Sequence, residues 1–150
     1  MDIEAFLVSS TVVCVLAQRL LRKVCDKCAE PYHLIPEDFA KLEYSPEDIG
    51  NYQFVKGKGC SRCRYTGYKG RIAVFEMLIL NEFVRDAILS QKSSYEIRKI
   101  SIETSGLLTL LEDAIHKAAN GTTTIEEIFR CVPKLIKPRS IKEIIRLQGN

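Results

Sequence analysis

The sequence has none of the short motifs that mark common catalytic and nucleotide-binding sites. Its 150 residues contain no G-x-x-x-x-G-K-[ST] phosphate loop, no G-x-G-x-x-G, no G-x-S-x-G and no H-E-x-x-H. Without these motifs the chain has no recognisable nucleotide cradle, hydrolase nucleophile or catalytic zinc pair. By itself it is therefore not expected to be an enzyme.

A hydrophobic run long enough to cross a membrane is also missing. The most apolar stretch, residues 5–17, has only thirteen residues, and a helix that spans a hydrocarbon core of ~30 Å needs more. We expect this stretch to be buried. No basic segment precedes it and no small residues follow it as a cleavage site, so export is not expected. In a reducing cytosol, cysteines are more often metal ligands than disulfides.

Composition places loose bounds on the fold and the partners. With 46% hydrophobic and 27% charged residues, the chain fits one globular domain or two small ones. Its apolar first residues suggest a piece of a larger protein. A formal charge of +3 demands no nucleic-acid or lipid partner. Six basic and no acidic residues lie between Lys56 and Arg71, however. This basic stretch is either a solvated face near a metal site or an anion-binding surface.

Two segments have the composition of β-strands. Residues 12–24 begin with β-branched side chains and then alternate loosely between apolar and polar ones. In residues 71–80, apolar side chains recur at every second position, as they do on one face of a strand. Both flank a segment rich in cysteine, glycine and proline, so we expect them to pair at its base. That segment, residues 25–70, predicts one short helix that begins at Pro36. It has too few regularly spaced apolar residues for a core of its own, and a structural zinc contributes most in that situation.

The sequence after residue 80 predicts helices, three of them with a capping residue before the first turn. Their expected extents are residues 82–90 after Asn81, 94–105 after Ser93, 107–120, and 124–132 after Thr123. Gly106, Gly121 and Pro133 are expected to end the last three. In the tail, Ser140 and Glu143 again have capping spacing, which predicts one weak helix.

Four cysteines form two C-x-x-C pairs, Cys25 with Cys28 and Cys60 with Cys63. Each pair can bend into a knuckle, and two facing knuckles supply the tetrahedron of sulfurs that Zn²⁺ prefers. The 31 residues between the pairs exceed the spacing of compact ribbons, but the cost of closing a loop grows only logarithmically. We predict one structural zinc without an open coordination position. Unrelated free cysteines, or a redox or iron–sulfur role, are the alternatives.

The remaining candidate side chains are assigned ordinary roles. Cys14 and Cys131 are interpreted as small buried hydrophobic residues, and His33 as neither a metal ligand nor a donor to one. The paired carboxylates of the helical half are expected on helix surfaces, where solvation or capping explains them: Glu112 with Asp113, and Glu126 with Glu127.

Three segments resemble a known family. They are FLVSSTVVCVLAQRLLRKVC, the second C-x-x-C followed by x-x-T-G-Y-K-G-R-I-A-V-F-E-M-L, and G-T-T-T-I-E-E-I-F-R. Together, over roughly residues 3–132, they resemble the C-terminal part of the ATPases of type II secretion and type IV pilus assembly. The resemblance implies a hexamer with a RecA-like ATPase core and, in assembly-type members, a zinc-binding tetracysteine insertion followed by a helical domain. The family's Walker motifs precede the part that this chain resembles, so the chain alone is not expected to hydrolyse ATP.

The resemblance also implies roles for particular residues. The four cysteines of the C-x-x-C pairs match the family's zinc ligands. Arg71, which ends the G-Y-K-G-R turn, and Arg19 of A-Q-R-L are implied contacts to nucleotide phosphates, with a salt bridge or a partner contact as the alternative. ATP and Mg²⁺ would bind only in the full-length protein. The implied partners are neighbouring subunits of a homohexamer and inner-membrane platform proteins, which would recruit the ATPase to the cytoplasmic face of the bacterial inner membrane.

The expected fold class is α/β, or α+β for this part alone. The expected segments are the end of a RecA-like sheet (1–24), the tetracysteine insertion (25–70), a strand returning to the sheet (71–80), a helical subdomain (81–133) and a tail (134–150). Two other functions stay open. One is a zinc ribbon that binds nucleic acid through the basic stretch, where Tyr65 and Tyr68 could stack on bases. It leaves the helical half unexplained, so no nucleic acid is expected. The other is a zinc-stabilised domain for protein interaction.

Overall fold

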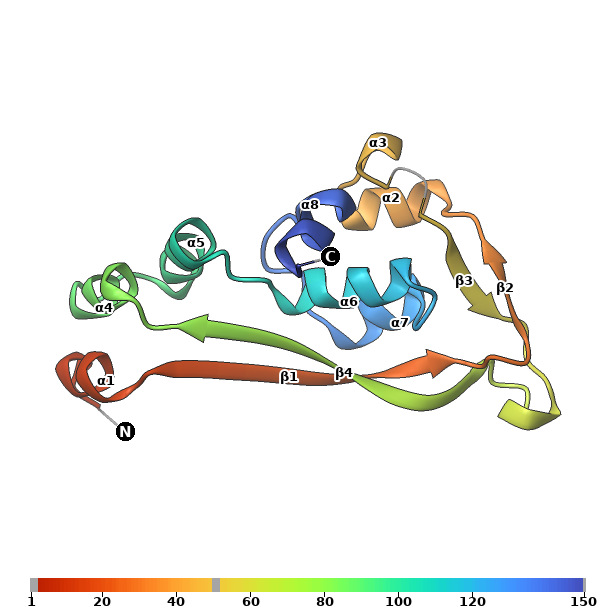
Figure 1. Cartoon of the computed structure of the whole chain (residues 1–150), viewed down its shortest axis with the longest axis horizontal. Helices are drawn as coiled ribbons and strands as arrows, with labels where there is room; N and C mark the ends of the chain where they lie inside the picture. Colours follow the sequence, from red (N-terminus) through yellow and green to blue (C-terminus); the bar gives the residue numbers. More distant parts are fainter. Residues whose placement is uncertain (1–2, 50–51, 150) are drawn as a thin grey trace. The chain divides into compact units, whose positions relative to one another are not determined.

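The computed structural model describes residues 3–49 and 52–149, which form two compact units. Unit 1 contains the residues up to Ala17 together with Glu76–Leu108, and unit 2 contains Gln18–Phe75 and the residues from Thr109 onward. The strands β1 (Cys14–Val24) and β4 (Tyr68–Ile79) pair with each other and contribute to both units. Their arrows point in opposite directions in Figure 1. The predicted pairing of residues 12–24 with 71–80 is confirmed.

Unit 1 contains the helices α1 (Ala5–Thr11), α4 (Glu82–Leu89) and α5 (Ser94–Ser105), and α4 contacts both α1 and α5. The predicted caps are present. The side chain of Asn81 accepts a hydrogen bond from the N–H of Val84 at 3.0 Å, and Ser93 forms a capping box with Glu96. These caps satisfy N–H groups that a helix leaves unpaired in its first turn.

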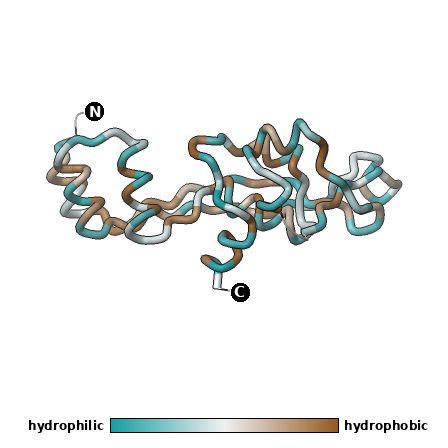
Figure 2. The backbone as a smooth tube through the Cα atoms, turned by 90° about the horizontal axis from the view of Figure 1, so that it is seen from above, coloured by the Kyte–Doolittle hydropathy of each residue, from teal (hydrophilic) through white to brown (hydrophobic). Residues whose placement is uncertain are grey.

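The prediction that residues 5–17 are buried is wrong. The segment forms α1 and the start of β1, and Phe6, Leu7 and Val13 are exposed by 66%, 51% and 71%. Cys14, expected to be buried, is exposed as well. Brown hydrophobic positions in the helix near the N label are visible in Figure 2. In the described residues α1 packs against α4, and this contact leaves these apolar side chains exposed.

In unit 2, the insertion between β1 and β4 contains a second sheet. β2 (Ala29–Tyr32) pairs with β3 (Phe54–Gly57) in antiparallel register. Two short helices lie between these strands, α2 (Pro36–Leu42) and α3 (Pro46–Ile49), so the helix predicted to begin at Pro36 is confirmed. A short 3-10 helix, η1 (Ser61–Cys63), precedes β4.

The remaining helices are α6 (Leu110–Ala119), α7 (Ile125–Cys131) and α8 (Ile141–Leu147), and both α7 and α8 contact α6. The core of unit 2 includes fully buried isoleucines from all three helices: Ile115, Ile125, Ile128, Ile141 and Ile144. The predicted weak helix in the tail is thus present and packed. In residues 3–49 and 52–149, no helix is long and apolar enough to cross a membrane.

Two helix starts differ from the prediction. α6 begins at Leu110, after a capping box of Thr109 with Glu112, instead of at residue 107. α7 is capped by Thr124, whose hydroxyl accepts from the N–H of Glu127 at 3.1 Å, instead of by Thr123. The hydroxyl of Thr123 instead donates to the carbonyl of Arg22 at 2.9 Å. The helices predicted as one subdomain also divide between the units, with α4 and α5 in unit 1 and α6 and α7 in unit 2.

Candidate metal centre

The four cysteines of the C-x-x-C pairs are brought together in unit 2, and their sulfurs all lie within 4.8 Å of one another. The sulfur of Cys60 is 3.9 Å from that of Cys25 and 3.8 Å from that of Cys63, and the sulfurs of Cys28 and Cys63 are 3.8 Å apart. Sulfurs bound at about 2.3 Å from a tetrahedral zinc ion are separated by about 3.8 Å. The cluster therefore has the size that a four-coordinate zinc requires.

Backbone contacts shape the two knuckles. Cys25 follows the last residue of β1, and its N–H donates to the carbonyl of Gly67 at 2.9 Å. The N–H of Cys28 donates to the carbonyl of Cys25, and that of Cys63 to the carbonyl of Cys60, each at 3.2 Å. The first knuckle thus closes the end of β1 and the second lies just before β4.

Burial and backbone N–H groups act in opposite directions on the sulfurs. Cys25, Cys28 and Cys63 are buried, and burial raises the pKa of the Cys28 thiol to about 12. Burial also disfavours the thiolate of Cys63, but hydrogen bonds from the N–H groups of Cys60 and Gly67 outweigh it and lower the pKa to about 6. Because a metal binds the thiolate, N–H donors aimed at sulfur help to hold the form that a metal needs.

Two glycines allow the insertion to close beside the sulfurs. Gly67 has a φ of +78°, and a Cβ added to it would lie 2.5 Å from the carbonyl oxygen of Gly57. A Cβ on Gly57 would lie 2.1 Å from the carbonyl oxygen of Gly67. Neither position has room for a side chain, so β3 and the segment before β4 can approach only as bare backbone.

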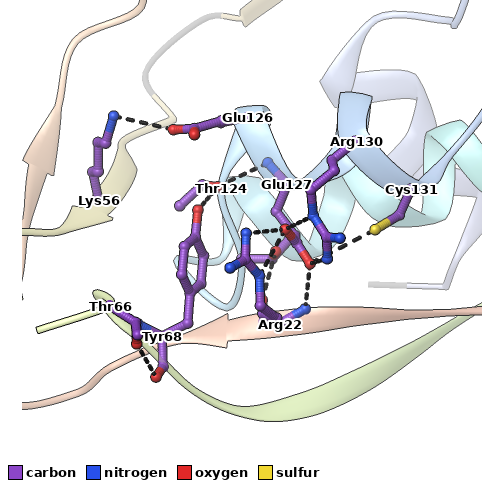
Figure 3. Close-up of polar contacts among 10 residues, drawn as sticks. Arg22, Lys56, Thr66, Tyr68, Thr124, Glu126, Glu127, Arg130 and Cys131 are labelled. Carbon is purple, nitrogen blue, oxygen red and sulfur yellow. Dashed lines mark hydrogen bonds and ion pairs between the residues drawn. The ribbon is translucent and has the colours of Figure 1, made fainter. Parts of the chain in front are cut away.

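A second cluster of polar side chains joins β1 to α7, and it includes a carboxylate that the sequence analysis placed on the surface (Figure 3). The Glu127 side chain is fully buried, whereas its neighbour Glu126 is 67% exposed. Glu127 accepts from the N–H of Arg22 at 2.9 Å and from its guanidinium at 2.9 and 2.7 Å. The guanidinium of Arg130 donates to it at 2.7 and 2.6 Å. The prediction of a surface position is therefore wrong for Glu127 and right for Glu126.

These contacts change the acidity of the cluster. Burial alone would raise the pKa of Glu127, but the hydrogen bonds from Arg130 and Arg22 lower it to about 2. Cys131 is half-buried instead of buried as expected, and its thiol lies 3.7 Å from a carboxylate oxygen of Glu127. Burial, followed by the charge of Glu127, raises the pKa of the Cys131 thiol. Glu127 is thus held as an anion between two arginines.

The threonines before Glu127 hold the base of the insertion. The carbonyl of Thr122 accepts from the N–H of Val24, directly before Cys25, at 2.9 Å. Tyr68, the first residue of β4, shares a hydrogen bond of 2.8 Å with the hydroxyl of Thr124. The Arg22 guanidinium lies 4.0 Å from the centre of the Tyr68 ring, a cation–π contact. We define these six residues as the Glu127 cluster: Arg22, Tyr68, Thr124, Glu127, Arg130 and Cys131.

The sequence analysis used the T-T-x-E-E motif as a mark of resemblance and missed its contacts. A run of threonines before paired glutamates signals a helix cap. It does not show that the backbone before the cap will join a strand about a hundred residues earlier. No local signal in the sequence marks the contact of Glu127 with Arg22, because the two residues are 105 positions apart.

The two arginines implied as phosphate contacts are exposed. Arg71 lies in β4, three residues after the strand begins, and Arg19 lies in β1, where its guanidinium donates to the carbonyl of Gln18 at 3.2 Å. In the basic stretch, half of the six cations are in ion pairs: Lys56 with Glu126, Lys58 with Glu30, and Arg62 with Asp26. His33 lines a separate cavity of about 490 Å³ and is not part of the sulfur cluster.

Comparison with known proteins gives a consistent family. The model of the family described as "Type II/IV secretion system protein" matches residues 1–130. The chain is 41% identical over 129 residues to the type IV pilus assembly ATPase PilB of Thermus thermophilus, covering 86% of the chain and 14% of that protein. It is 34% identical over 130 residues to the type II secretion system protein E of Aeromonas hydrophila, covering 87% of the chain and 25% of that protein. The type IV pilus assembly ATPase PilB of Myxococcus xanthus is 30% identical to the chain over 129 residues, and the match covers 85% of the chain and 23% of that protein. The chain thus spans a quarter or less of the length of these relatives.

Proposed function

Because the chain belongs to the type II/IV secretion system protein family, we propose that it is the zinc-binding and helical C-terminal part of a hexameric ATPase that drives type II secretion or type IV pilus assembly. The observation that carries the proposal is the sulfur cluster, with its tetrahedral spacing, inside the part of the chain that the family model matches. The names of the relatives support both processes, so the proposal covers both.

The proposed ligands of the zinc are the four cysteines, Cys25, Cys28, Cys60 and Cys63. Bound zinc supplies four strong bonds and no open coordination position, which makes it a structural ion. Its place between the end of β1 and the segment before β4 means that the ion closes the insertion at its base. The proposed role of the zinc is to fix both ends of the insertion to β1 and β4, so that the two strands and the insertion move together.

Exposed apolar side chains support the proposal that β1 and β4 are the end of a RecA-like sheet. Within unit 1, Leu16, Met77 and Ile79 are exposed by 58%, 50% and 44%. Contiguous apolar surface on a sheet is normally covered by another part of the protein. In the longer relatives, most of the polypeptide lies outside the part that this chain matches. We propose that this remaining part of the polypeptide covers the exposed apolar side chains.

Arg71 and Arg19 are proposed to contact nucleotide phosphates in the full-length ATPase, within a subunit or across a subunit boundary. Their exposure on paired strands leaves the guanidinium groups accessible, and a guanidinium offers forked donors that suit phosphate. The proposed partners are the neighbouring subunits and the inner-membrane platform proteins, and the proposed location is the cytoplasmic face of that membrane. No nucleic-acid partner is proposed, because ion pairs occupy half of the basic stretch.

The test uses the full-length protein. Wild type is expected to contain one zinc per subunit and to hydrolyse ATP. A variant with all four cysteines changed to serine is expected to lose the zinc and to support neither secretion nor pilus assembly. Normal transport by a zinc-free tetraserine variant would contradict the structural role of zinc.

A second test addresses the phosphate contact. Arg71→Ala is expected to lower the kcat of ATP hydrolysis while the zinc is retained. Lys69→Ala, which removes another exposed cation of β4, is the matched control. Equal kcat values for the two β4 variants would contradict the phosphate contact.

A further inference from the structure

The end of the chain is packed into unit 2, although it lies outside the residues that the family model matches. We call residues 134–149 the tail. Its helix α8 contacts α6 and also α3 of the insertion, as Figure 1 shows. Ile141 and Ile144 of α8 are fully buried. The family model matches residues 1–130, so the packing of the tail does not follow from that match.

One arginine anchors the tail to α6. The Arg139 backbone N–H and Nε donate to one carboxylate oxygen of Glu112 at 3.0 and 2.8 Å, and its Nη2 donates to the other at 2.7 Å. The Arg139 and Glu112 side chains are only 18% and 3% exposed. The surface position expected for Glu112 is therefore wrong, although its capping role is right, since it also closes the capping box of α6. Burial would raise the pKa of Glu112, but Arg139 and the Thr109 N–H outweigh it and lower the pKa.

The neighbouring carboxylate of α6 is a second anchor. Asp113 is buried too, against expectation. It accepts a hydrogen bond from the side chain of Gln148 at 3.1 Å, and the N–H of Phe75 in β4 donates to it at 2.8 Å. Lys117, one turn later, donates to both of its oxygens. The first turn of α6 therefore holds both ends of α8.

The same tail residues hold the insertion. The hydroxyl of the buried Tyr44, which follows α2, donates to the carbonyl of Arg139. The ammonium of Lys134 donates to the carbonyl of Lys41 at 3.0 Å and pairs with Glu43 at 2.5 Å. Arg139 thus contacts α6 through its guanidinium and the insertion through its carbonyl.

We propose that the tail is an intramolecular strap that fixes the helical part of the insertion, α2 and α3, to α6. The sulfur cluster pins only the base of the insertion. Beyond it, α6 also contacts β3, and the ion pair of Lys56 with Glu126 is exposed, a kind of pair that contributes little. The buried contacts of the strap join the far end of the insertion to the helices, so the two move as one body. This inference does not depend on the ATPase function.

Hydrogen exchange of the complete zinc-loaded chain tests the strap. In Arg139→Ala, amides of residues 36–49 are expected to exchange about tenfold faster or more, because a buried hydrogen-bonded tie is lost. The matched control is Arg146→Ala, which removes an exposed arginine of α8 and is expected to leave exchange unchanged. The zinc content is expected to stay at one ion per chain in both variants.

A second variant separates the strap from a general loss of folding. Arg139→Ala leaves the buried Glu112 without a cation and could unfold α6. Tyr44→Phe removes only the hydroxyl on the insertion side, and it is expected to speed exchange in residues 36–49 while α6 keeps its protection. The proposal is overturned if Tyr44→Phe leaves residues 36–49 as protected as in wild type. It is also overturned if α6 loses protection together with them in that variant.

Discussion

Replacing the buried carboxylate of Glu127 is the sharpest test of how unit 2 is held together. Glu127→Gln keeps the size of the side chain and removes the charge. In either orientation, the new amide points N–H donors at donors of Arg22 or Arg130, because both carboxylate oxygens accept from both arginines. Removing one partner of a fully buried, hydrogen-bonded ion pair typically costs about 3 to 5 kcal/mol. Here the carboxylate is buried, but the Arg22 and Arg130 side chains are 40% and 56% exposed, so water can solvate the arginines after the change. We therefore expect a smaller loss of about 2 kcal/mol, the cost of hydrogen bonds to a charged group, which is still a large share of a domain stability of about 5 to 15 kcal/mol.

The chain offers a matched control one residue away. Glu126→Gln makes the same chemical change in the same turn of α7, but Glu126 and its partner Lys56 are 67% and 55% exposed. An exposed pair contributes about 0 to 1 kcal/mol. Urea unfolding of the zinc-loaded proteins, followed by far-ultraviolet circular dichroism, gives both values. Equal losses in the two variants would refute the argument that burial makes the Glu127 contacts strong.

The acidity of Glu127 gives the same experiment a second readout. Its pKa of about 2 in the folded protein lies below the ordinary value of 4.5. The stabilisation that the ionised Glu127 carboxylate gives to the folded protein is therefore fully present above pH 4.5, and it is lost as the pH falls toward 2. Wild type is expected to lose stability steeply in this window. Glu127→Gln is expected to lose less there, and parallel acid profiles for the two proteins would contradict the assigned pKa.

Three further outcomes are expected. Gly67→Ala should weaken zinc binding and destabilise unit 2 by more than Gly149→Ala does, as measured by zinc titration and urea unfolding. Both glycines have a positive φ, but an added Cβ would clash with backbone at Gly67 and meets nothing within 4 Å at Gly149. Chelation of the zinc should increase hydrogen exchange in β2 and β3 first, because the ion closes the base of the insertion, and uniform exchange changes across unit 2 would argue otherwise. Asn81→Ala should cost about 1 kcal/mol of stability through loss of the α4 cap, and a thermal melt that matches wild type would exclude that role.

Local patterns determined the elements of this protein. The helix that begins at Pro36 and the caps at Asn81 and Ser93 follow from residues within a few positions of one another. The two strands were predicted from their own composition, and their pairing from their places on either side of the cysteine-rich segment. Two C-x-x-C pairs were enough to predict which four side chains meet, because four buried thiols at that spacing have few other uses.

Long-range contacts decided what sequence patterns could not. Glu126 and Glu127 are chemically identical and adjacent, yet only Glu127 meets Arg22, a residue 105 positions earlier. Residues 5–17 are apolar enough for a core, but exposure depends on which elements lie next to them in the folded chain. The tail has a weak helical pattern, and its burial follows from the position of Glu112 and Tyr44 opposite Arg139. Composition and periodicity describe a segment's own preferences, whereas burial and charge pairing belong to the neighbours that folding brings to it.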